Sequence, residues 1–498
     1  MEELRERLAS LEALERASAV LSWDEETYMP EAGGPARAEH LARLAAMAHD
    51  MLVAPETACL LDASSVRPGS IDSAIVRVTR RDHDQAARVP TSLVAEIQRH
   101  ASLAHPIWVH ARERNDFAAF APVMEKTFDL ARELAEHLGY RARAYDALLD
   151  QFEPGTTSKE VDGIFAQLKA RLVPLAAAIR ERARPGEDAV LHGDFDVAEQ
   201  ERFGLQMIRK FGFDLARGRL DQVVHPFETS FSRDDVRITT RYDRTYLADS
   251  LFSTLHEAGH GMYEQGVAAD LEGTPLASGA SSALHESQSR LWENVVGRSL
   301  GVWQHFYPEL QRAFPGQLGS VPLDRFYRAI NRVKPSLVRV DADEVTYNLH
   351  VMLRYEMEQG LLSGEIPVAD AARVWNDKME DYLGIRPPDN SLGILQDTHW
   401  ASGLIGYFPT YALGNVLSVQ FFNRAREEHP EIDEEIATGE FATLRGWLEE
   451  NIYRHGRRFD PQDLVRRATG GPMTTGPYLD YLERKFSVLY GLSSPVSP

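Results

Sequence analysis

Helical periodicity dominates this 498-residue sequence and constrains its fold more than any other feature. Apolar residues recur at three-to-four spacing near the start and again in the ranges 91–116, 122–150, 158–183 and 196–214. This spacing is typical of helices with one apolar face. Strand signals are scarce, and the best is 235–242, whose β-branched residues alternate for a few positions. With neither a fixed-period repeat nor a flexible linker, the sequence predicts a mainly α-helical fold in a single domain over 1–498.

Charge and composition exclude several classes of function. The formal net charge is −21, and a nucleic-acid backbone requires a basic surface as its partner. No apolar run reaches the roughly 18 residues of a membrane span. The first six residues are charged and lack the layout of a signal peptide. The single cysteine, Cys59, rules out an intrachain disulfide, fits a reducing cytoplasm, and is expected to fill part of the core.

The segment 256–260 reads His-Glu-Ala-Gly-His and so has the pattern H-E-x-x-H. Residues four apart lie on one face of a helix. His256 and His260 can therefore both direct a ring nitrogen at one metal ion. Glu257 projects to the side, where it can take a proton from the attacking water. This spacing predicts a metallopeptidase centre, although two histidines on a buried helix face are the alternative until a third ligand is found.

An apolar stripe through Leu251 and Leu255 supports a helix around this motif. Asp249 or Ser250 is expected to cap its start, and Gly266 its end. Gly259 and Gly261 each oppose the helix by roughly 1 kcal/mol relative to alanine. Two glycines at a metal site suggest close approach by another backbone or by substrate.

A third metal ligand is expected in the segment 281–288, which follows after a loop. Ser281 and Ser282 can cap a second helix there, and Glu286 falls in its first turn. Together with the two histidines it completes a His₂Glu set, the kind that leaves one zinc position open for catalysis. His285 is adjacent but points about 100° away around the helix. We expect it to support the ligands or to contact substrate.

Further motifs accompany the metal ligands in a characteristic order: Leu21–Asp24 with Thr27, Met29 and Pro30; His225–Phe227; Asp235–Thr239; His285–Gln288 with Trp292 and Glu293; Val338–Asp343; and Gly393–Trp400. In this order the chain resembles the carboxypeptidase Taq family of metallocarboxypeptidases over nearly its whole length. The one visible departure is Val338, where the family pattern has isoleucine, and this change is mild.

The resemblance implies an all-α, two-lobed body with a deep catalytic cleft, similar to neurolysin and angiotensin-converting enzyme. It also implies a cytoplasmic homodimer with one Zn²⁺ per chain, for which Co²⁺ or Mn²⁺ can substitute. The implied activity is release of single amino acids from peptides that have a free carboxyl terminus. The alternatives are a zinc endopeptidase or a dipeptidyl carboxypeptidase of the same fold class, and a helical scaffold that keeps metal only for stability.

Two further groups of site residues are expected from the same likeness. His399, Tyr407 and Tyr411 resemble the histidine and two tyrosines of angiotensin-converting enzyme, and His399 with one tyrosine is expected to stabilise the oxyanion. A free substrate carboxylate is best bound by an arginine. Arg339 is the first candidate and Arg237 the second. The remaining two candidates, His225 and Gln396, are expected to line the cleft in a structural role.

Overall fold

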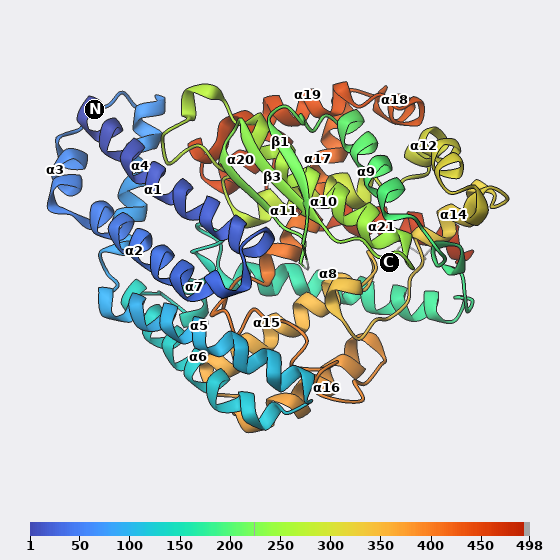
Figure 1. Ribbon diagram of the computed structural model, residues 1–498, viewed down its shortest axis with the longest axis horizontal. Coiled ribbons are helices and arrows are strands. Elements are labelled where there is room, and N and C mark those ends of the chain that lie inside the picture. The colour runs from blue at the N-terminus through green and yellow to red at the C-terminus, as the bar shows by residue number, and fades with distance from the viewer. Residues whose placement is uncertain (224, 493–498) are drawn as a thin grey trace. The chain divides into compact units, whose positions relative to one another are not determined.

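Helices make up most of the chain, as the periodicity predicts. The computed structural model describes residues 1–223 and 225–492 (Figure 1). The chain divides into two compact units, each assembled from three segments. The first unit contains Met1–Ala87, Gly186–Ile330 and Leu417–Met473; the second contains Arg88–Pro185, Asn331–Val416 and Thr474–Pro498. The expectation of one domain over 1–498 stays a prediction.

The first unit holds most of the α-helices and the small sheet. Its helices are α1 (Glu2–Thr27), α2 (Gly34–Val53), α3 (Pro55–Ala63), α4 (Ile71–Ala86), α9 (Val197–Phe211), α10 (Leu247–Gly266), α11 (Ser282–Arg290), α12 (Leu300–Ala313), α13 (Pro315–Leu318), α14 (Leu323–Ile330), α18 (Ile432–Thr438), α19 (Ala442–Asn451) and α20 (Pro461–Thr469). A π-helix, η4 (Leu291–Val296), continues α11. Short 3-10 turns lie at η1 (Glu31–Gly33), η2 (Ala189–Leu191), η3 (Ala269–Leu271) and η7 (Tyr453–Arg458).

The second unit is helical in all its described elements. Its helices are α5 (Thr91–Glu113), α6 (Phe117–Leu138), α7 (Ala144–Leu149), α8 (Ser158–Arg180), α15 (Tyr347–Ser363), α16 (Ala371–Leu383) and α21 (Gly476–Tyr490), with 3-10 turns η5 (Arg339–Asp341) and η6 (Val368–Asp370). Helix α17 (Pro409–Glu428) begins in this unit and ends in the first.

One sheet of three short strands lies against the metal-motif helix in the first unit (Figure 1). The strands are β1 (Gly218–Gln222), β2 (Glu228–Ser232) and β3 (Asp235–Thr240), in the order β1-β3-β2. β3 pairs parallel with β1 and antiparallel with β2. The prediction of a strand from residue 235 is confirmed, whereas β1 and β2 were not predicted.

Helix boundaries follow local chemistry that the periodicity alone does not contain. The predicted helix 122–150 is wrong in its bounds, because α6 begins after Asp116 and ends at Leu138. The Asp116 carboxylate accepts a hydrogen bond from Ala119 N, which caps the helix, and Gly139 ends it at φ 78°. A new helix, α7, then starts at Ala144.

Cys59 is exposed, so the expectation that it fills the core is wrong. It lies on α3, whose buried side chains are Thr57 and Leu61. Cys59 is two residues from each of them and therefore lies on a different face of the helix.

Membrane-spanning potential is limited to one bent pair of segments in the described residues. No single helix among them is long and apolar enough to cross a bilayer. Glu39–Val53 and Pro55–Ala63 meet the length and composition together, with a 42° bend between them.

Candidate metal centre

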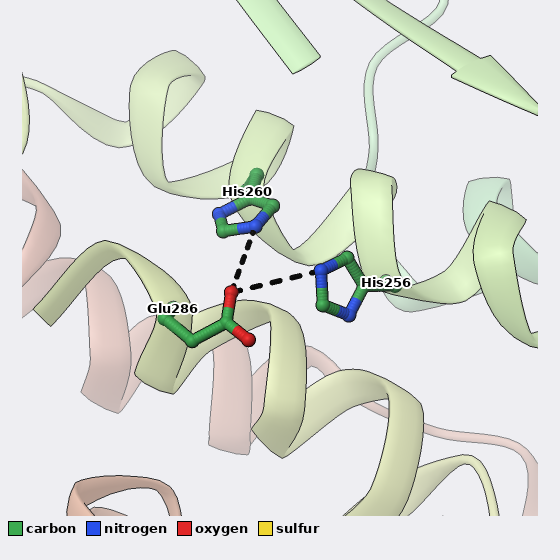
Figure 2. Close-up of side chains that lie close together, drawn as sticks. All are labelled: His256, His260 and Glu286. Carbon is green, nitrogen blue, oxygen red and sulfur yellow. Dashed lines mark ion pairs between the residues drawn. The ribbon is translucent and has the colours of Figure 1, made fainter. Parts of the chain in front are cut away.

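The two motif histidines and Glu286 converge on one point in the first unit. His256 and His260 lie one turn apart on α10, and Glu286 lies on α11 (Figure 2). The Nε2 atoms of His256 and His260 are 3.6 and 3.4 Å from Glu286 Oε2. Two atoms bound to one tetrahedral zinc ion at about 2.0–2.1 Å are themselves about 3.3–3.4 Å apart. The donor set therefore fits a divalent metal.

Among residues 1–223 and 225–492, His256, His260 and Glu286 form the one group of three His, Cys, Asp or Glu side chains whose ligand atoms lie within 4.8 Å of one another. The spacing of the motif explains the convergence, because positions 256 and 260 share one face of α10.

Gly259 allows α10 and α11 to approach closely enough to bring the three ligands together. A Cβ at position 259 would lie 2.6 Å from Gln288 O and 2.7 Å from Ser289 Cα, both on α11. Any side chain there would force the two helices apart. The expectation that a glycine permits close approach by another backbone is confirmed at this position. At Gly261 the close neighbour is instead the Phe213 ring, 2.6 Å away.

The caps of these helices follow two different rules. Ser281 caps α11, since its side chain accepts a hydrogen bond from Leu284 N, as predicted. The predicted cap of α10 is wrong, because this helix begins at Leu247 after Tyr246 and has no side-chain cap. Ser250 donates to Gln200 instead, and Asp249 pairs with Arg241. Burial of α10, rather than a capping hydrogen bond, fixes where it starts.

Arg290 and Glu293 contact the metal ligands and hold them in place. Glu293 Oε2 lies 2.9 Å from His256 Nδ1, so the histidine's other nitrogen is left to face the metal. Arg290 donates from Nε to Glu286 Oε1 at 2.6 Å and from Nη1 to Glu293 Oε2 at 3.2 Å. Glu286 thus offers its second oxygen, Oε2, to the histidines. Positions 286, 290 and 293 share one face because they are spaced by four and three.

Burial and charge keep His260 and Glu286 in the protonation states that metal binding requires. Burial lowers the pKa of His260 to about 3, so the ring is neutral. Burial alone would raise the pKa of Glu286, but Arg290 and His256 outweigh it, and the pKa lies well below its usual range. A neutral imidazole and an ionised carboxylate are the forms that bind metal.

Glu257 combines burial with neighbouring negative charge. Its side chain is buried at 6 % exposure. Burial raises its pKa to about 7, with a further contribution from Glu286 and Glu293 that His256 opposes. A carboxyl group with a pKa in this range can both accept and return a proton near neutral pH.

His285 lies behind His260 and outside the ligand group. Its Nδ1 is 2.5 Å from His260 Nδ1, and the two rings stack at a centroid distance of 4.6 Å. Its Nε2 is 2.9 Å from Glu264 Oε1. The position matches the expectation that this histidine supports the ligands.

Arg237, the second candidate for binding the substrate carboxylate, lies on β3 in the same unit. It donates two hydrogen bonds to Asp235 at 2.8 and 3.1 Å. Its guanidinium also stacks on the Trp23 ring, 4.4 Å from the centroid. A carboxylate and an aromatic face thus already hold this side chain.

All but one of the remaining expected residues gather in the second unit around Asp397; the exception is His225. Arg339 donates to Asp397 Oδ1 at 2.9 Å and to Tyr347 OH at 2.8 Å. Arg354 donates to Asp397 Oδ2 at 2.5 Å and to Gln396 Oε1 at 2.6 Å. Two buried arginines therefore share one carboxylate, which leaves this cluster with a surplus positive charge.

His399 and the two tyrosines lie beside this arginine pair. His399 Nε2 is 3.1 Å from Tyr411 OH, and the Tyr411 ring lies 4.9 Å from the Arg339 guanidinium carbon. The Tyr407 ring is 5.2 Å from that of Tyr411 and 6.0 Å from that of His399. Burial lowers the pKa of His399 to about 3, with Asp397 opposing and the arginines adding to the effect. The structure therefore brings all three together.

Of the two residues expected to line a cleft, one is tied into this cluster. Gln396 is buried, accepts from Arg339 N at 2.9 Å and donates to Leu337 O at 2.9 Å. Its contacts suit a structural role. His225 is exposed.

Exchange of Asp397 for asparagine is expected to lower the free energy of unfolding by about 3–5 kcal/mol, because two buried guanidinium groups would then face a neutral amide. Burial would raise the pKa of Asp397, but Arg339 and Arg354 outweigh it and hold the pKa well below its usual range. This stabilisation is therefore present above the unfolded pKa of about 3.9 and is lost as pH falls through the folded value. Urea unfolding at neutral and acid pH measures both effects.

The matched control is Asp377→Asn, which removes one carboxylate partner of Arg373 and Arg386 where the aspartate side chain is 47 % exposed. Surface pairs contribute about 1 kcal/mol or less. Equal stability changes in the two variants would show that Asp397 does not hold the arginine pair.

Comparison with known proteins identifies the family. The family described as "Carboxypeptidase Taq (M32) metallopeptidase" matches residues 3–486. "Thermostable carboxypeptidase 1" of Thermus thermophilus is 41 % identical over 487 residues, 95 % of each chain. The chain belongs to the carboxypeptidase Taq (M32) family of metallopeptidases. "Carboxypeptidase 1" of Bacillus subtilis is 38 % identical over 477 residues, again 95 % of each chain.

The M32 fold is shared as well as the sequence. The solved M32 carboxypeptidase of Deinococcus radiodurans superposes with a TM-score of 0.95 at 42 % identity and covers 98 % of this chain and 99 % of its own. The structural match confirms the predicted, mainly helical fold class, and the family match confirms the predicted resemblance. The chain is thus a metallocarboxypeptidase by family.

Several residues that support the metal ligands or the arginine pair were not named in that role from the sequence. Arg290, Glu293 and Glu264 hold the metal ligands, and Asp397 holds the arginine pair. The spacing of Arg290 and Glu293 from Glu286 could have revealed the first two, because helix geometry places them on one face. No spacing reveals Asp397, which lies 58 residues from Arg339.

Proposed function

We propose that this M32 enzyme removes single amino acids from the free carboxyl terminus of peptides, with one Zn²⁺ held by His256, His260 and Glu286. The observation that carries the proposal is the convergence of two imidazole nitrogens and one carboxylate oxygen within 4.8 Å. Two histidines and a glutamate form the ligand set of zinc peptidases that keep one position open. Co²⁺ or Mn²⁺ is proposed to substitute for zinc.

Glu257 is proposed as the general base. A zinc ion held by His256, His260 and Glu286 would lower the pKa of a bound water to about 7 and would polarise the scissile carbonyl. The Glu257 carboxylate then takes the proton from the attacking water and later delivers it to the leaving amine. Its pKa of about 7 suits both directions of transfer.

His399 and one of the two tyrosines, Tyr411 or Tyr407, are proposed to stabilise the developing oxyanion. The His399 ring is neutral, because its pKa is lowered to about 3, and can donate a hydrogen bond without adding a charge. Its 3.1 Å contact with Tyr411 holds the two groups together. Fixed donors of this kind lower the barrier where negative charge develops.

Arg339 is proposed to bind the substrate carboxylate, with Arg237 as the second candidate. Arg339 and Arg354 share Asp397, so their cluster carries one surplus positive charge that a carboxylate can compensate. Arg237 forms a neutral pair with Asp235. This difference in local charge favours Arg339.

The test compares a peptide acid with its carboxamide. Charge-assisted hydrogen bonds contribute on the order of 1.5–3 kcal/mol, so amidation is expected to lower kcat/KM at least tenfold. Arg339→Ala should remove this difference between the two peptides, whereas Arg237→Ala should leave it. Separating the products by mass at early times measures both the rate and the length of each product.

Product length decides between this proposal and its alternatives. An endopeptidase would cut the amidated peptide as fast as the acid and at internal bonds. A dipeptidyl carboxypeptidase would release pairs of residues instead of single amino acids. Either pattern in the parent enzyme would replace the proposed specificity and leave the metal centre unaffected.

We further propose that the enzyme is a cytoplasmic homodimer with the whole chain acting as one catalytic domain. A single cysteine and an acidic surface support a reducing, soluble setting in which nucleic acid and membranes are not partners. The family likeness supports the dimer.

A further inference from the structure

The two histidine ligands are held in different ways. His256 Nδ1 faces a carboxylate directly, since Glu293 Oε2 lies 2.9 Å away. His260 Nδ1 faces a second imidazole, with His285 Nδ1 2.5 Å away. On the His260 side, the carboxylate contacts the second imidazole and not the ligand itself. Glu264 Oε1 is 2.9 Å from His285 Nε2.

Along the path from His260 through His285 to Glu264, the position of each proton is determined by the nitrogen of His260 that faces the metal. When Nε2 of His260 binds the metal ion, the proton of the neutral ring must be on Nδ1. His260 Nδ1 then donates to His285 Nδ1, which must accept. The proton of His285 is consequently on Nε2 and is donated to Glu264. Glu228 Oε2 is 3.9 Å from the same nitrogen, too far to replace Glu264 as acceptor.

Glu264 is itself fixed on both oxygens. Gly279 N donates to Oε1 at 3.1 Å, and Ser230 Oγ donates to Oε2 at 3.3 Å. Gly279 suits this contact because a Cβ there would lie 2.7 Å from His285 Cδ2. Arg16 anchors β2, the strand that carries Ser230, since its Nη1 donates to Ser230 O at 2.6 Å.

Ring packing fixes the orientation of His285 as well. Its ring stacks on His260 at 4.6 Å with an interplanar angle of 21°, and on Tyr263 at 5.4 Å with 25°. The imidazole therefore packs against two rings that limit its rotation. Glu264 selects which of its nitrogens carries the proton.

We propose that Glu264, acting through His285, is a positioning residue that holds His260 in the tautomer and orientation needed to bind metal. The inference rests on the proposed function, since it requires a metal at His256, His260 and Glu286. Neither residue touches the substrate in this role, and metal binding, not turnover alone, reports it.

The experiment measures metal affinity by competition with a chelator in full-length variants. Glu264→Leu and His285→Phe are each expected to weaken Zn²⁺ binding about 10–100-fold, the range typical for partners of ligand histidines. Stoichiometry at saturating metal should stay near one ion per chain. Glu264→Gln retains an oxygen that can accept from His285 and should recover most of the affinity. The absorption spectrum of the Co²⁺ form should shift in the first two variants.

Gln265→Leu is the matched control for general damage. Gln265 is the next residue of α10, is buried, and bonds to Asp214 N and Asp214 O at 2.9 Å. Its loss should lower stability yet leave metal affinity within about twofold, because its partners lie outside the path through His285.

A double variant shows whether Glu264 acts through His285 or whether the two residues affect metal binding independently. If Glu264 acts through His285, the variant that combines Glu264→Leu and His285→Phe should bind metal no more weakly than the weaker single variant. Additive losses, or single variants within threefold of the parent, would overturn the proposal. A parent that binds no metal, or whose His256→Ala variant retains it, would instead overturn the proposed metal centre.

Discussion

Replacement of Glu257 by glutamine is expected to lower turnover about 10²–10⁴-fold, the range typical of a lost general base. The amide keeps the size of the side chain but cannot take a proton from water. Metal content should remain near one ion per chain, because the three ligands are unchanged. Steady-state kinetics together with metal analysis of the same preparation measure both quantities.

Glu56→Gln is the control for this exchange, since it makes the same isosteric change at an exposed position of α3. That variant should match the parent in turnover. A Glu257→Gln enzyme within tenfold of the parent would show that another group acts as the base.

Loss of any one of the three ligands is expected to abolish tight metal binding and, with it, activity. His256, His260 and Glu286 each supply one atom to a group whose atoms lie within 4.8 Å of one another, and two ligands alone bind zinc weakly. His256→Ala, His260→Ala and Glu286→Ala should each contain far less than one ion per chain after gel filtration. Full metal content in any of them would remove that residue from the ligand set.

His285→Ala provides the contrast to these variants. His285 is adjacent to Glu286 in sequence and contacts His260, yet it supplies no atom to the ligand group. Its stoichiometry at saturating metal is expected to stay near one. Loss of zinc in this variant alone would contradict the assignment of Glu286 as the third ligand.

Local spacing explains why the ligand set could be predicted from the sequence. His256 and His260 are four residues apart, and a helix brings such positions onto one face whatever surrounds it. Ser281 capped the next helix as expected, although Glu286 lies just beyond the first turn, because the helix begins at Ser282. The close approach at Gly259 also followed from one residue type, because only glycine permits a backbone contact of this kind.

Features set by distant parts of the chain could not be predicted in this way. β1, Gly-Arg-Leu-Asp-Gln, has little strand propensity and forms because it pairs with β3. The start of α10 is set by burial, although Asp249 and Ser250 are good capping residues. The Arg339–Asp397–Arg354 cluster joins segments 43 and 58 residues apart, and no local pattern records that contact.

The most direct test of metal-dependent carboxypeptidase chemistry is a Zn²⁺ titration of chelator-stripped enzyme, followed by release of the C-terminal amino acid from a free-acid peptide. No release is expected before zinc is added, and the rate of release should then rise linearly and stop rising at one equivalent per chain. Single amino acids should be the first products throughout. Undiminished release by the stripped enzyme, or a rise that zinc does not produce, would contradict a catalytic metal at His256, His260 and Glu286.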